Sequence, residues 1–448
     1  MKDNFFLKNT TKVFFVCIGG ESMSALAEYF LLKNFTVLGS DVKKTAKTER
    51  LQSLGATIFY EQNGKNLSGV DLVVYSSAVD ENCVEIQVAK SKNIPCIKRS
   101  ILLGDILGGF NKSIGVSGCH GKTTTTAMIA DIFICAELDP TVFLGGSSKS
   151  VHNFRNGNGD FCIVEACEFK KSFLDMMPKI VVVTNIDNDH LDCYKSMQNI
   201  VDAFKEFVGD KLAVVNADDV YAQEISNYTT LTFGINNSAH YYATKIKKDK
   251  NGYSFTACAF GRVYGRIKLK VQGVYNVYNA LCAFAVADLS GVPFGKIKKG
   301  LEQFCGVERR NQIIGKKFNL TCKVDYAHHP TEIKSILSTI NLDKTIVVFQ
   351  PHTYSRTKYL MNDFVNALKD VRFLVLVSTY SARESFDELG SVELLKENLQ
   401  KASENQCIYI KSLAELISVV LDETDKYEQI MFLGAGDVYD LAQKFIEI

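Results

Sequence analysis

The sequence has almost no net charge and no long apolar run. Its 448 residues include 51 Lys and Arg against 50 Asp and Glu, a net charge of +1. This balance excludes a general electrostatic attraction to nucleic acid or to an anionic membrane. No apolar stretch approaches the roughly 20 residues that span a bilayer. Residues 1–9 also lack the apolar core and cleavage site of a signal peptide. We therefore expect a soluble cytoplasmic protein that binds neither nucleic acid nor membrane.

Paired cysteine motifs are also absent. The 13 cysteines are scattered, with no CxxC pair, and Cys162 and Cys167 flank an acidic position rather than forming a zinc knuckle. In a chain of this length, the spacing favours free and mostly buried thiols in a reducing compartment.

The composition, 46% hydrophobic and 23% charged, is typical of a globular protein, and the length predicts about three domains. Apolar runs alternate with helical patterns in three blocks, which predicts α/β domains with parallel sheets and ligands at the carboxyl ends of the strands. The glycine-rich residues 104–112 are interpreted as a linker, and residues 229–272 as β-hairpins. The predicted strands are 13–18, 36–38, 71–75, 161–164, 180–183, 212–215, 320–324, 345–349, 373–377 and 430–433.

The most specific motif is Gly118-Cys-His-Gly-Lys-Thr-Thr124, between a short strand and a helical pattern. Glycines let backbone N–H groups wrap a triphosphate, and a helix N-terminus adds a favourable dipole. Lys122 would reach the β- and γ-phosphates, and the Thr123 hydroxyl would bind magnesium. Val116 stands where a strict P-loop has glycine, so the alternative is a glycine-rich turn that happens to precede Lys-Thr.

Further metal ligands are predicted at the ends of two apolar strands. Glu165 ends the strand 161–164, and His190 follows the strand 180–183. Together with Thr123 they predict a site for Mg²⁺ or Mn²⁺, although one imidazole is unusual among oxygen ligands. The alternatives are a surface carboxylate and a loop histidine.

Eight motifs in one order make the chain resemble the Mur ligases, a family that adds amino acids to the peptidoglycan precursor. The motifs are Gly19-Gly20-x-x-Met23-Ser24, Gly118-Cys-His-Gly-Lys-Thr-Thr124, Glu165-Ala-Cys-Glu168, Thr184-Asn-Ile-x-x-Asp-His190, Gly306-Val-x-Arg309-Arg310, Asp325-Tyr-x-His-His-Pro-Thr-Glu332, Gln350-Pro-His-x-Tyr-x-Arg-Thr357 and Gly434-Ala-Gly-Asp437.

The resemblance implies three domains. These are a Rossmann-like UDP-binding domain over residues 1–107, a central domain over 108–314 and a Rossmann-like amino-acid-binding domain over 315–448. The central domain is expected to be P-loop ATPase-like, with a mostly parallel sheet and a small β section. The expected reaction is the ATP-dependent joining of L-alanine to the carboxylate of UDP-N-acetylmuramate through an acyl phosphate, by a monomer or a homodimer.

The resemblance also implies site residues. ATP would be bound by Gly118, Cys119, His120, Gly121, Lys122, Thr123, Thr124, Asn276, Asn279, Arg310 and Asp325. Alanine would meet Tyr326, His328, His352 and Arg356. The UDP-sugar would meet Gly19, Gly20, Met23 and Ser24, and the positions of Asp41, Ser76 and Ser77 after strands add them as candidates.

Chemistry assigns three catalytic candidates. Lys122 would neutralise charge on the transferring phosphoryl group. His352 would accept the proton of the alanine amine, with His328 or substrate phosphate as alternatives. Arg356 would hold the alanine carboxylate, unless it forms a surface ion pair. His328 and His329 could instead form the entry to a helix that begins at Pro330.

The chain departs from the family pattern at several positions. Cys17 and Ser22 replace glycines of the first loop, Cys167 replaces an aspartate, and Tyr275 replaces a histidine. Sibling ligases carry a carbamylated lysine where Phe204 stands, so we do not expect that modification.

Three alternative functions stay open. A recycling ligase of the same family would join a whole tripeptide to UDP-N-acetylmuramate. An NAD-dependent oxidoreductase would use the first domain, but it lacks a clean Gly-x-Gly-x-x-Gly and leaves Lys122 and Thr123 without a role. A non-catalytic switch would bind ATP and a partner only.

Overall fold

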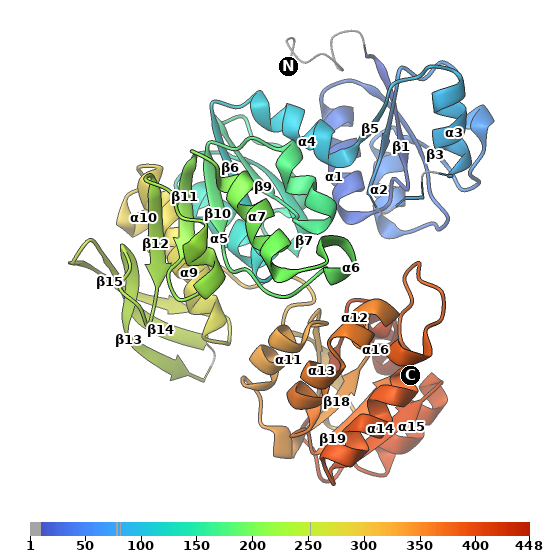
Figure 1. The fold of residues 1–448 in the computed structure, drawn as a ribbon, viewed down its shortest axis with the longest axis vertical. Helices are drawn as coiled ribbons and strands as arrows, with labels where there is room; N and C mark the ends of the chain where they lie inside the picture. The colour runs from blue at the N-terminus through green and yellow to red at the C-terminus, as the bar shows by residue number, and fades with distance from the viewer. Residues whose placement is uncertain (1–9, 78, 81, 251) are drawn as a thin grey trace.

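The computed structural model describes residues 10–77, 79–80, 82–250 and 252–448. Residues 1–9, on which the expectation of no signal peptide depends, lie outside this range. The chain forms three α/β domains, each around its own sheet, as the sequence predicts (Figure 1). The blue N-terminal domain and the orange to red C-terminal domain both adjoin the central domain.

The N-terminal domain has a fully parallel five-stranded sheet in the order β3-β2-β1-β4-β5. This order places the ends of β1 and β4 together, where a Rossmann-like sheet binds its ligand. Its strands are β1 (Lys12–Val16), β2 (Thr36–Ser40), β3 (Thr57–Phe59), β4 (Leu72–Tyr75) and β5 (Cys96–Lys98), and its helices are α1 (Glu21–Leu32), α2 (Ala46–Ser53), α3 (Val84–Ser91) and α4 (Arg99–Gly108).

The predicted linker over residues 104–112 is wrong in its first part, because α4 continues to Gly108. Gly104 lies inside this helix, where a Cβ atom would come within 2.1 Å of the Asp175 carbonyl oxygen. The glycine therefore permits close packing between two segments and does not mark a turn.

The central domain is built on one ten-stranded sheet, in the order β15-β14-β13-β12-β11-β10-β6-β9-β7-β8. It is parallel from β7 to β13 and antiparallel at both ends, where β8 pairs with β7 and β13–β15 form hairpins. The prediction of hairpins over residues 229–272 is wrong for residues 230–234, because β12 pairs in parallel with both β11 and β13. The strands are β6 (Lys112–Ser117), β7 (Thr141–Ser148), β8 (His152–Arg155), β9 (Phe161–Glu165), β10 (Ile180–Val183), β11 (Leu212–Asn216), β12 (Thr230–Gly234), β13 (Tyr241–Asp249), β14 (Gly252–Ala259) and β15 (Arg262–Leu269).

Helices cover both faces of this sheet. The helix α5 (Lys122–Cys135) packs against α9 (Tyr275–Leu289) and α10 (Phe294–Gln303). The other helices are α6 (Leu191–Tyr194), α7 (Met197–Val208) and α8 (Val220–Glu224).

The C-terminal domain has a six-stranded sheet in the order β16-β17-β21-β18-β19-β20, parallel except for β16. The first of these strands crosses the predicted domain boundary between residues 314 and 315. The elements are β16 (Gln312–Lys317), β17 (Leu320–Asp325), α11 (Pro330–Leu337), β18 (Thr345–Phe349), α12 (Tyr354–Tyr359), α13 (Met361–Leu368), β19 (Phe373–Val377), α14 (Val392–Ala402), β20 (Gln406–Ile410), α15 (Leu413–Leu421), β21 (Gln429–Leu433) and α16 (Val438–Glu447).

The two outer domains meet the central domain in different ways. One apolar cluster runs from the N-terminal domain into the central domain, where Tyr29 packs against Phe143 and Phe154 at ring distances of 5.7 and 6.0 Å. The buried apolar clusters of the C-terminal domain, within the described part of the chain, contain no central-domain residue. The C-terminal domain is therefore joined to the central domain chiefly through polar contacts.

The structure bears on two expectations from the composition, which concern the cysteines and a membrane-spanning segment. All 13 cysteines are free; five are buried, seven are half-buried and Cys305 is exposed, so the expectation that most thiols are buried is wrong. Among the described residues, none of the helices has the length and apolar character needed to cross a membrane.

Packing between α5 and α10 gives a test of the fold. A Cβ atom at Gly300 would lie 2.5 Å from the Ile132 Cα atom, whereas one at Gly295 in the same helix would meet nothing within 4 Å. We expect Gly300→Ala to lower the free energy of unfolding by about 1–3 kcal/mol, because overpacking forces the two helices apart. Gly295→Ala, the matched control, should leave it unchanged or slightly raised. Urea denaturation measures both, and equal values for the two variants would contradict this packing.

Candidate active site

The loop of residues 118–121 joins β6 to α5 and requires glycine at both ends. Gly118 and Gly121 have φ angles of +127° and +83°, a region that disfavours other residues. A Cβ atom at Gly118 would lie 2.1 Å from the Thr184 Oγ1 atom, and one at Gly121 would lie 2.7 Å from the Asn279 Oδ1 atom. The loop therefore brings its backbone close to two neighbouring elements and leads into the N-terminus of α5.

Lys122 begins α5 and folds back over this loop. Its Nζ atom donates to the carbonyls of Gly118 at 2.6 Å and Cys119 at 3.1 Å, and it pairs with Glu168 at 2.9 Å. The lysine side chain is only 13% exposed. Burial opposes its charge, but the Glu168 carboxylate outweighs this effect and raises the pKa of Lys122. A charged ammonium thus lies over the loop in which phosphates would bind.

Two of the three predicted metal ligands are in contact. The Thr123 hydroxyl donates to the Glu165 Oε2 atom at 2.8 Å, and the Gly145 N–H donates to the same oxygen at 2.9 Å. His190 pairs with Glu168 at 3.8 Å and with Asp189 at 3.7 Å. A hydroxyl and a carboxylate side by side fit the hard oxygen ligands of Mg²⁺. The assignment of all three residues to a metal stays a prediction.

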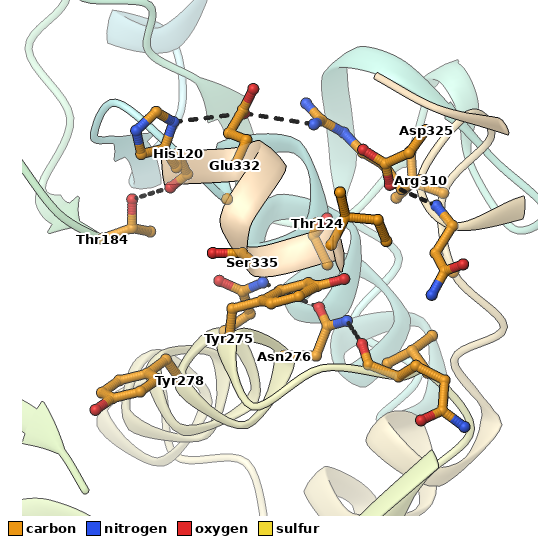
Figure 2. A pocket seen from close by; sticks show the side chains of 18 of the residues that line it. His120, Thr124, Thr184, Tyr275, Asn276, Tyr278, Arg310, Asp325, Glu332 and Ser335 are labelled. Carbon is orange, nitrogen blue, oxygen red and sulfur yellow. Dashed lines mark hydrogen bonds and ion pairs between the residues drawn. The ribbon is translucent and has the colours of Figure 1, made fainter. Parts of the chain in front are cut away.

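A cavity of about 1260 Å³ lies between the central and C-terminal domains (Figure 2). It is larger than most ligand pockets, which measure about 300–1,000 Å³. The predicted nucleotide residues that line it are His120, Gly121, Thr124, Asn276, Asn279, Arg310 and Asp325. Gly118, Cys119, Lys122 and Thr123 belong to the same loop and helix start without lining the cavity. The structure thus gathers distant parts of the chain around one space.

One wall of the cavity is the start of α9. The Asn276 side chain donates to the Gln272 carbonyl at 2.7 Å, and the Asn279 side chain donates to the Asn276 Oδ1 atom at 3.1 Å. The Thr125 hydroxyl donates to the Asn279 Oδ1 atom at 3.2 Å, which ties α9 to α5. Tyr275, which stands where the family has histidine, also lines the cavity.

The opposite wall comes from the C-terminal domain and carries both positively and negatively charged side chains. Figure 2 shows Glu332 between His120 and Arg310, at 3.4 and 3.6 Å. The Asp325 carboxylate accepts the N–H groups of Asn311 and Ala327. Burial raises the pKa of Asp325 to about 6, against the opposing effect of Arg310.

The segment of residues 187–190, which precedes α6, forms the polar contact with the C-terminal domain. The Thr331 hydroxyl donates to the Asp187 Oδ2 atom at 2.6 Å. The Arg356 guanidinium donates twice to the Asp189 Oδ1 atom, at 2.9 and 3.1 Å. Burial opposes ionisation of Asp189, but Arg356 holds its pKa well below the usual range. Arg356 therefore forms an ion pair between domains.

The residues predicted to meet alanine lie together. The rings of Tyr326 and His328 are 5.3 Å apart, and those of His328 and His352 are 5.4 Å apart. The Arg356 Nη1 atom lies 3.2 Å from the His352 Nδ1 atom. Burial lowers the pKa of His328 to about 3, and burial together with Arg356 lowers that of His352 to about 4. Both imidazoles are therefore neutral near pH 7.

Pro330 begins α11 and His329 is its N-cap, which accepts the Thr331 N–H at 3.3 Å. The helix entry expected as an alternative for His328 and His329 is thus present. Only His329 caps the helix, so His328 still lies with the residues predicted to meet alanine.

In the N-terminal domain, the predicted sugar-binding residues are engaged within the protein. The Gly19 N–H donates to the Asp41 Oδ2 atom at 2.8 Å. Met23 and Ser24 are buried, and the Ser24 hydroxyl accepts a hydrogen bond from Asn153 of the central domain. Gly20 is the N-cap of α1, and Ser76 and Ser77 follow β4, where the Ser77 carbonyl accepts from Lys170 at 3.0 Å.

Two departures from the family pattern have a visible setting. Cys17 adopts a φ angle of +57°, so the loop keeps a left-handed residue without a glycine. Phe204 is fully buried and packs against Phe173 with a ring distance of 5.1 Å. The position at which sibling ligases carry a modified lysine is here part of the apolar core.

Sequence reasoning assigned no role to four acidic residues of this region: Glu168, Asp187, Asp189 and Glu332. Glu168, Asp189 and Glu332 belong to the motifs shared with the family. Their fixed places in those motifs are the sequence signal that could have indicated a role. Glu168 is 2% exposed, and a nearly buried carboxylate requires a partner, which is Lys122.

Three family models match consecutive parts of the chain: the Mur ligase family catalytic domain at residues 12–111, the Mur ligase middle domain at 116–287 and the Mur ligase glutamate ligase domain at 309–436. The chain belongs to the Mur ligase family. A curated relative of this Mur ligase, the UDP-N-acetylmuramate–L-alanine ligase of Clostridium tetani, is 38% identical over 454 residues and 99% of each chain.

Solved structures agree with this membership. The UDP-N-acetylmuramate-alanine ligase of Thermotoga maritima is 30% identical, with a TM-score of 0.83 over 97% of this chain and 98% of that chain. A murein peptide ligase from Psychrobacter arcticus is 22% identical, with a TM-score of 0.74 over 98% of each chain, and shares the fold. The fold alone therefore does not show which amino acid or peptide a ligase of this family joins.

Proposed function

We propose that this Mur ligase joins L-alanine to the carboxylate of UDP-N-acetylmuramate and converts ATP to ADP and phosphate. The observation that carries the proposal is the cavity that the phosphate loop shares with the C-terminal domain, in a chain similar over its full length to ligases of this name. The carboxylate is a poor electrophile, so transfer of the γ-phosphoryl group to it would form an acyl phosphate. The alanine amine would then attack the acyl carbon and release phosphate.

In this proposal the loop of residues 118–121 holds the triphosphate. Its glycines present backbone N–H groups, and Lys122 places a positive charge where negative charge develops during transfer. Asn276 and Asn279 lie at the other wall of the cavity, where an adenine base would contact them. Arg310 and Asp325 would close the nucleotide in from the C-terminal domain.

Magnesium, or manganese in its place, would be held by Thr123 and Glu165, with His190 as a further candidate ligand. The bound ion supplies charge neutralisation on the phosphate oxygens. Cys167 offers no carboxylate where the family commonly has one, so Glu165 and Glu168 are the acidic groups of this strand end.

The N-terminal domain would deliver the UDP-sugar at the carboxyl ends of β1 and β4. Gly19, Gly20, Ser76 and Ser77 lie at these ends. Asp41 contacts the Gly19 N–H, so in this proposal it shapes the loop in addition to any contact with ribose. Met23 and Ser24 are both buried, so in this proposal they would support the loop from the protein interior.

Alanine would enter beside Tyr326, His328, His352 and Arg356. The guanidinium of Arg356 matches a carboxylate, and it already holds that of Asp189. The attacking amine must lose a proton, and His352, whose imidazole is neutral, is the proposed acceptor. His328 and a substrate phosphate are the alternative acceptors. The proposal places the enzyme in the cytoplasm, as a monomer or homodimer, in line with its free cysteines.

A coupled assay with a panel of acceptors tests this function. With ATP, Mg²⁺ and UDP-N-acetylmuramate, we expect ADP release with free L-alanine and little with the tripeptide L-Ala-γ-D-Glu-diaminopimelate. Lys122→Ala should reduce turnover by two to three orders of magnitude, since such electrostatic interactions are worth about 3–4 kcal/mol. Preference for the tripeptide would favour the recycling ligase. ATP binding without ADP release for any acceptor would favour the non-catalytic switch.

Arg356 gives a second prediction. Arg356→Ala should raise the KM for L-alanine at least about tenfold and change the KM for ATP much less, because a hydrogen bond to a charged group is worth about 1.5–3 kcal/mol. Asp189→Asn is the matched control, because it weakens the ion pair but keeps the guanidinium. Steady-state kinetics measures both. If the two variants raise the KM for alanine equally, Arg356 acts through the domain contact and not through alanine.

A further inference from the structure

His120, Asp187 and His329 converge where the central and C-terminal domains meet. The His120 Nε2 atom lies 2.8 Å from the Asp187 Oδ2 atom, and the His329 Nδ1 atom lies 3.6 Å from the same oxygen. The two imidazole rings are 4.9 Å apart. One ligand atom from each residue lies within 4.8 Å of the others. The cluster is separate from the Thr123 and Glu165 pair, with which it shares no residue.

The orientation of His329 is set by its outer nitrogen. The Nε2 atom lies 3.2 Å from the Asn188 carbonyl oxygen, which can only accept, so Nε2 carries the hydrogen. In the neutral ring the Nδ1 atom then bears the single lone pair, which accepts the Thr331 N–H at 3.3 Å. The Nδ1 atom also lies 3.6 Å from the Asp187 Oδ2 atom, and a cation between the two atoms would take the lone pair in place of the Thr331 hydrogen bond.

The other two residues are also oriented from outside. The His120 Nδ1 atom lies 3.4 Å from the Glu332 Oε1 atom, shown in Figure 2, and its Nε2 atom makes a hydrogen bond of 2.8 Å to the Asp187 Oδ2 atom. A bound cation would take the place of the Nε2 hydrogen, while an Nδ1–H would still face Glu332. The Thr331 hydroxyl donates to Asp187 at 2.6 Å. Metal-binding histidines characteristically donate their other N–H to a carboxylate or a backbone carbonyl, and both histidines here have such a partner.

We propose that His120, Asp187 and His329 form a binding site for a divalent transition metal such as Zn²⁺ or Co²⁺. Two imidazoles and one carboxylate suit these ions better than Mg²⁺, which prefers oxygen ligands alone. Ligand atoms around a tetrahedral zinc lie roughly 3.4 Å apart, given metal–ligand distances of about 2.1 Å. The separations of 2.8 and 3.6 Å lie on either side of this value, so binding would move the His120 and Asp187 atoms apart. His120 and Asp187 also line the cavity, from which a water oxygen can complete the coordination.

The site would join two domains. His120 and Asp187 belong to the central domain, whereas His329 caps α11 of the C-terminal domain. A metal bound by all three would hold the start of α11 against the phosphate loop, in addition to the ion pair of Arg356 with Asp189. The proposal does not depend on which amino acid the ligase joins.

Titration of the full-length, metal-free protein with Co²⁺ in millimolar Mg²⁺ tests the proposal. We expect one Co²⁺ per chain with visible d–d absorption and without the near-ultraviolet thiolate band that a cysteine ligand gives. His329→Asn keeps an N-cap residue, and Asp187→Asn keeps the side-chain shape. Each should weaken Co²⁺ binding at least about tenfold, the loss typical even of outer partners. Glu165→Gln, the control at the proposed magnesium site, should leave Co²⁺ binding unchanged.

Four results would overturn the proposal. One is the absence of Co²⁺ uptake by the unaltered protein, in which case an imidazolium at His120 bridges the two carboxylates by hydrogen bonds alone. Another is uptake that neither His329→Asn nor Asp187→Asn changes, and a third is uptake that shows a thiolate band. The fourth is an equal loss in Glu165→Gln. Circular dichroism of each variant checks that the fold is kept, so that lost binding reports on the ligands.

Discussion

The loop of residues 118–121 is the constraint on which the site depends. Its middle is held by the end of the neighbouring strand, because the Thr184 hydroxyl and the Asn185 side chain both donate to the His120 carbonyl, at 2.6 and 2.9 Å. The Asn185 side chain also accepts the His120 N–H at 2.8 Å. The loop is thus held in place by the protein itself, with Lys122 folded over it, and such preorganisation is what the proposed electrostatic catalysis would require.

The two outer domains are attached by different forces, and this difference suits their proposed tasks. Apolar burial between Tyr29, Phe143 and Phe154 joins the N-terminal domain to the central sheet. Ion pairs such as Arg356 with Asp189 join the C-terminal domain, and they cost desolvation as well as gaining attraction. A polar contact can be exchanged for contacts with substrate charges, so the C-terminal domain is the one suited to open and close over the cavity.

The sequence predicts the three-block fold and most of the strands at the centre of each sheet. Buried parallel strands such as 345–349 consist of nearly continuous apolar runs, which are easy to recognise. The sequence also predicts the glycine-rich loop of residues 118–121 between a strand and a helix, because its glycines and lysine are local in sequence. The linker prediction is wrong at Gly104, because in sequence a glycine required for close packing looks like one that ends a helix. The pairing of His120 with Glu332 could not be predicted, since it joins residues 212 apart (332 − 120) through the packing of two domains.

In the proposed mechanism the loop beginning at Gly118 holds the triphosphate of ATP. A crystal structure with Mg²⁺ and a non-hydrolysable ATP analogue would test this placement. We expect phosphate oxygens on the backbone N–H groups of residues 118–123, beside Lys122 and with the ion near Thr123 and Glu165. We also expect adenine near Asn276. A triphosphate bound anywhere else on the protein would contradict this placement.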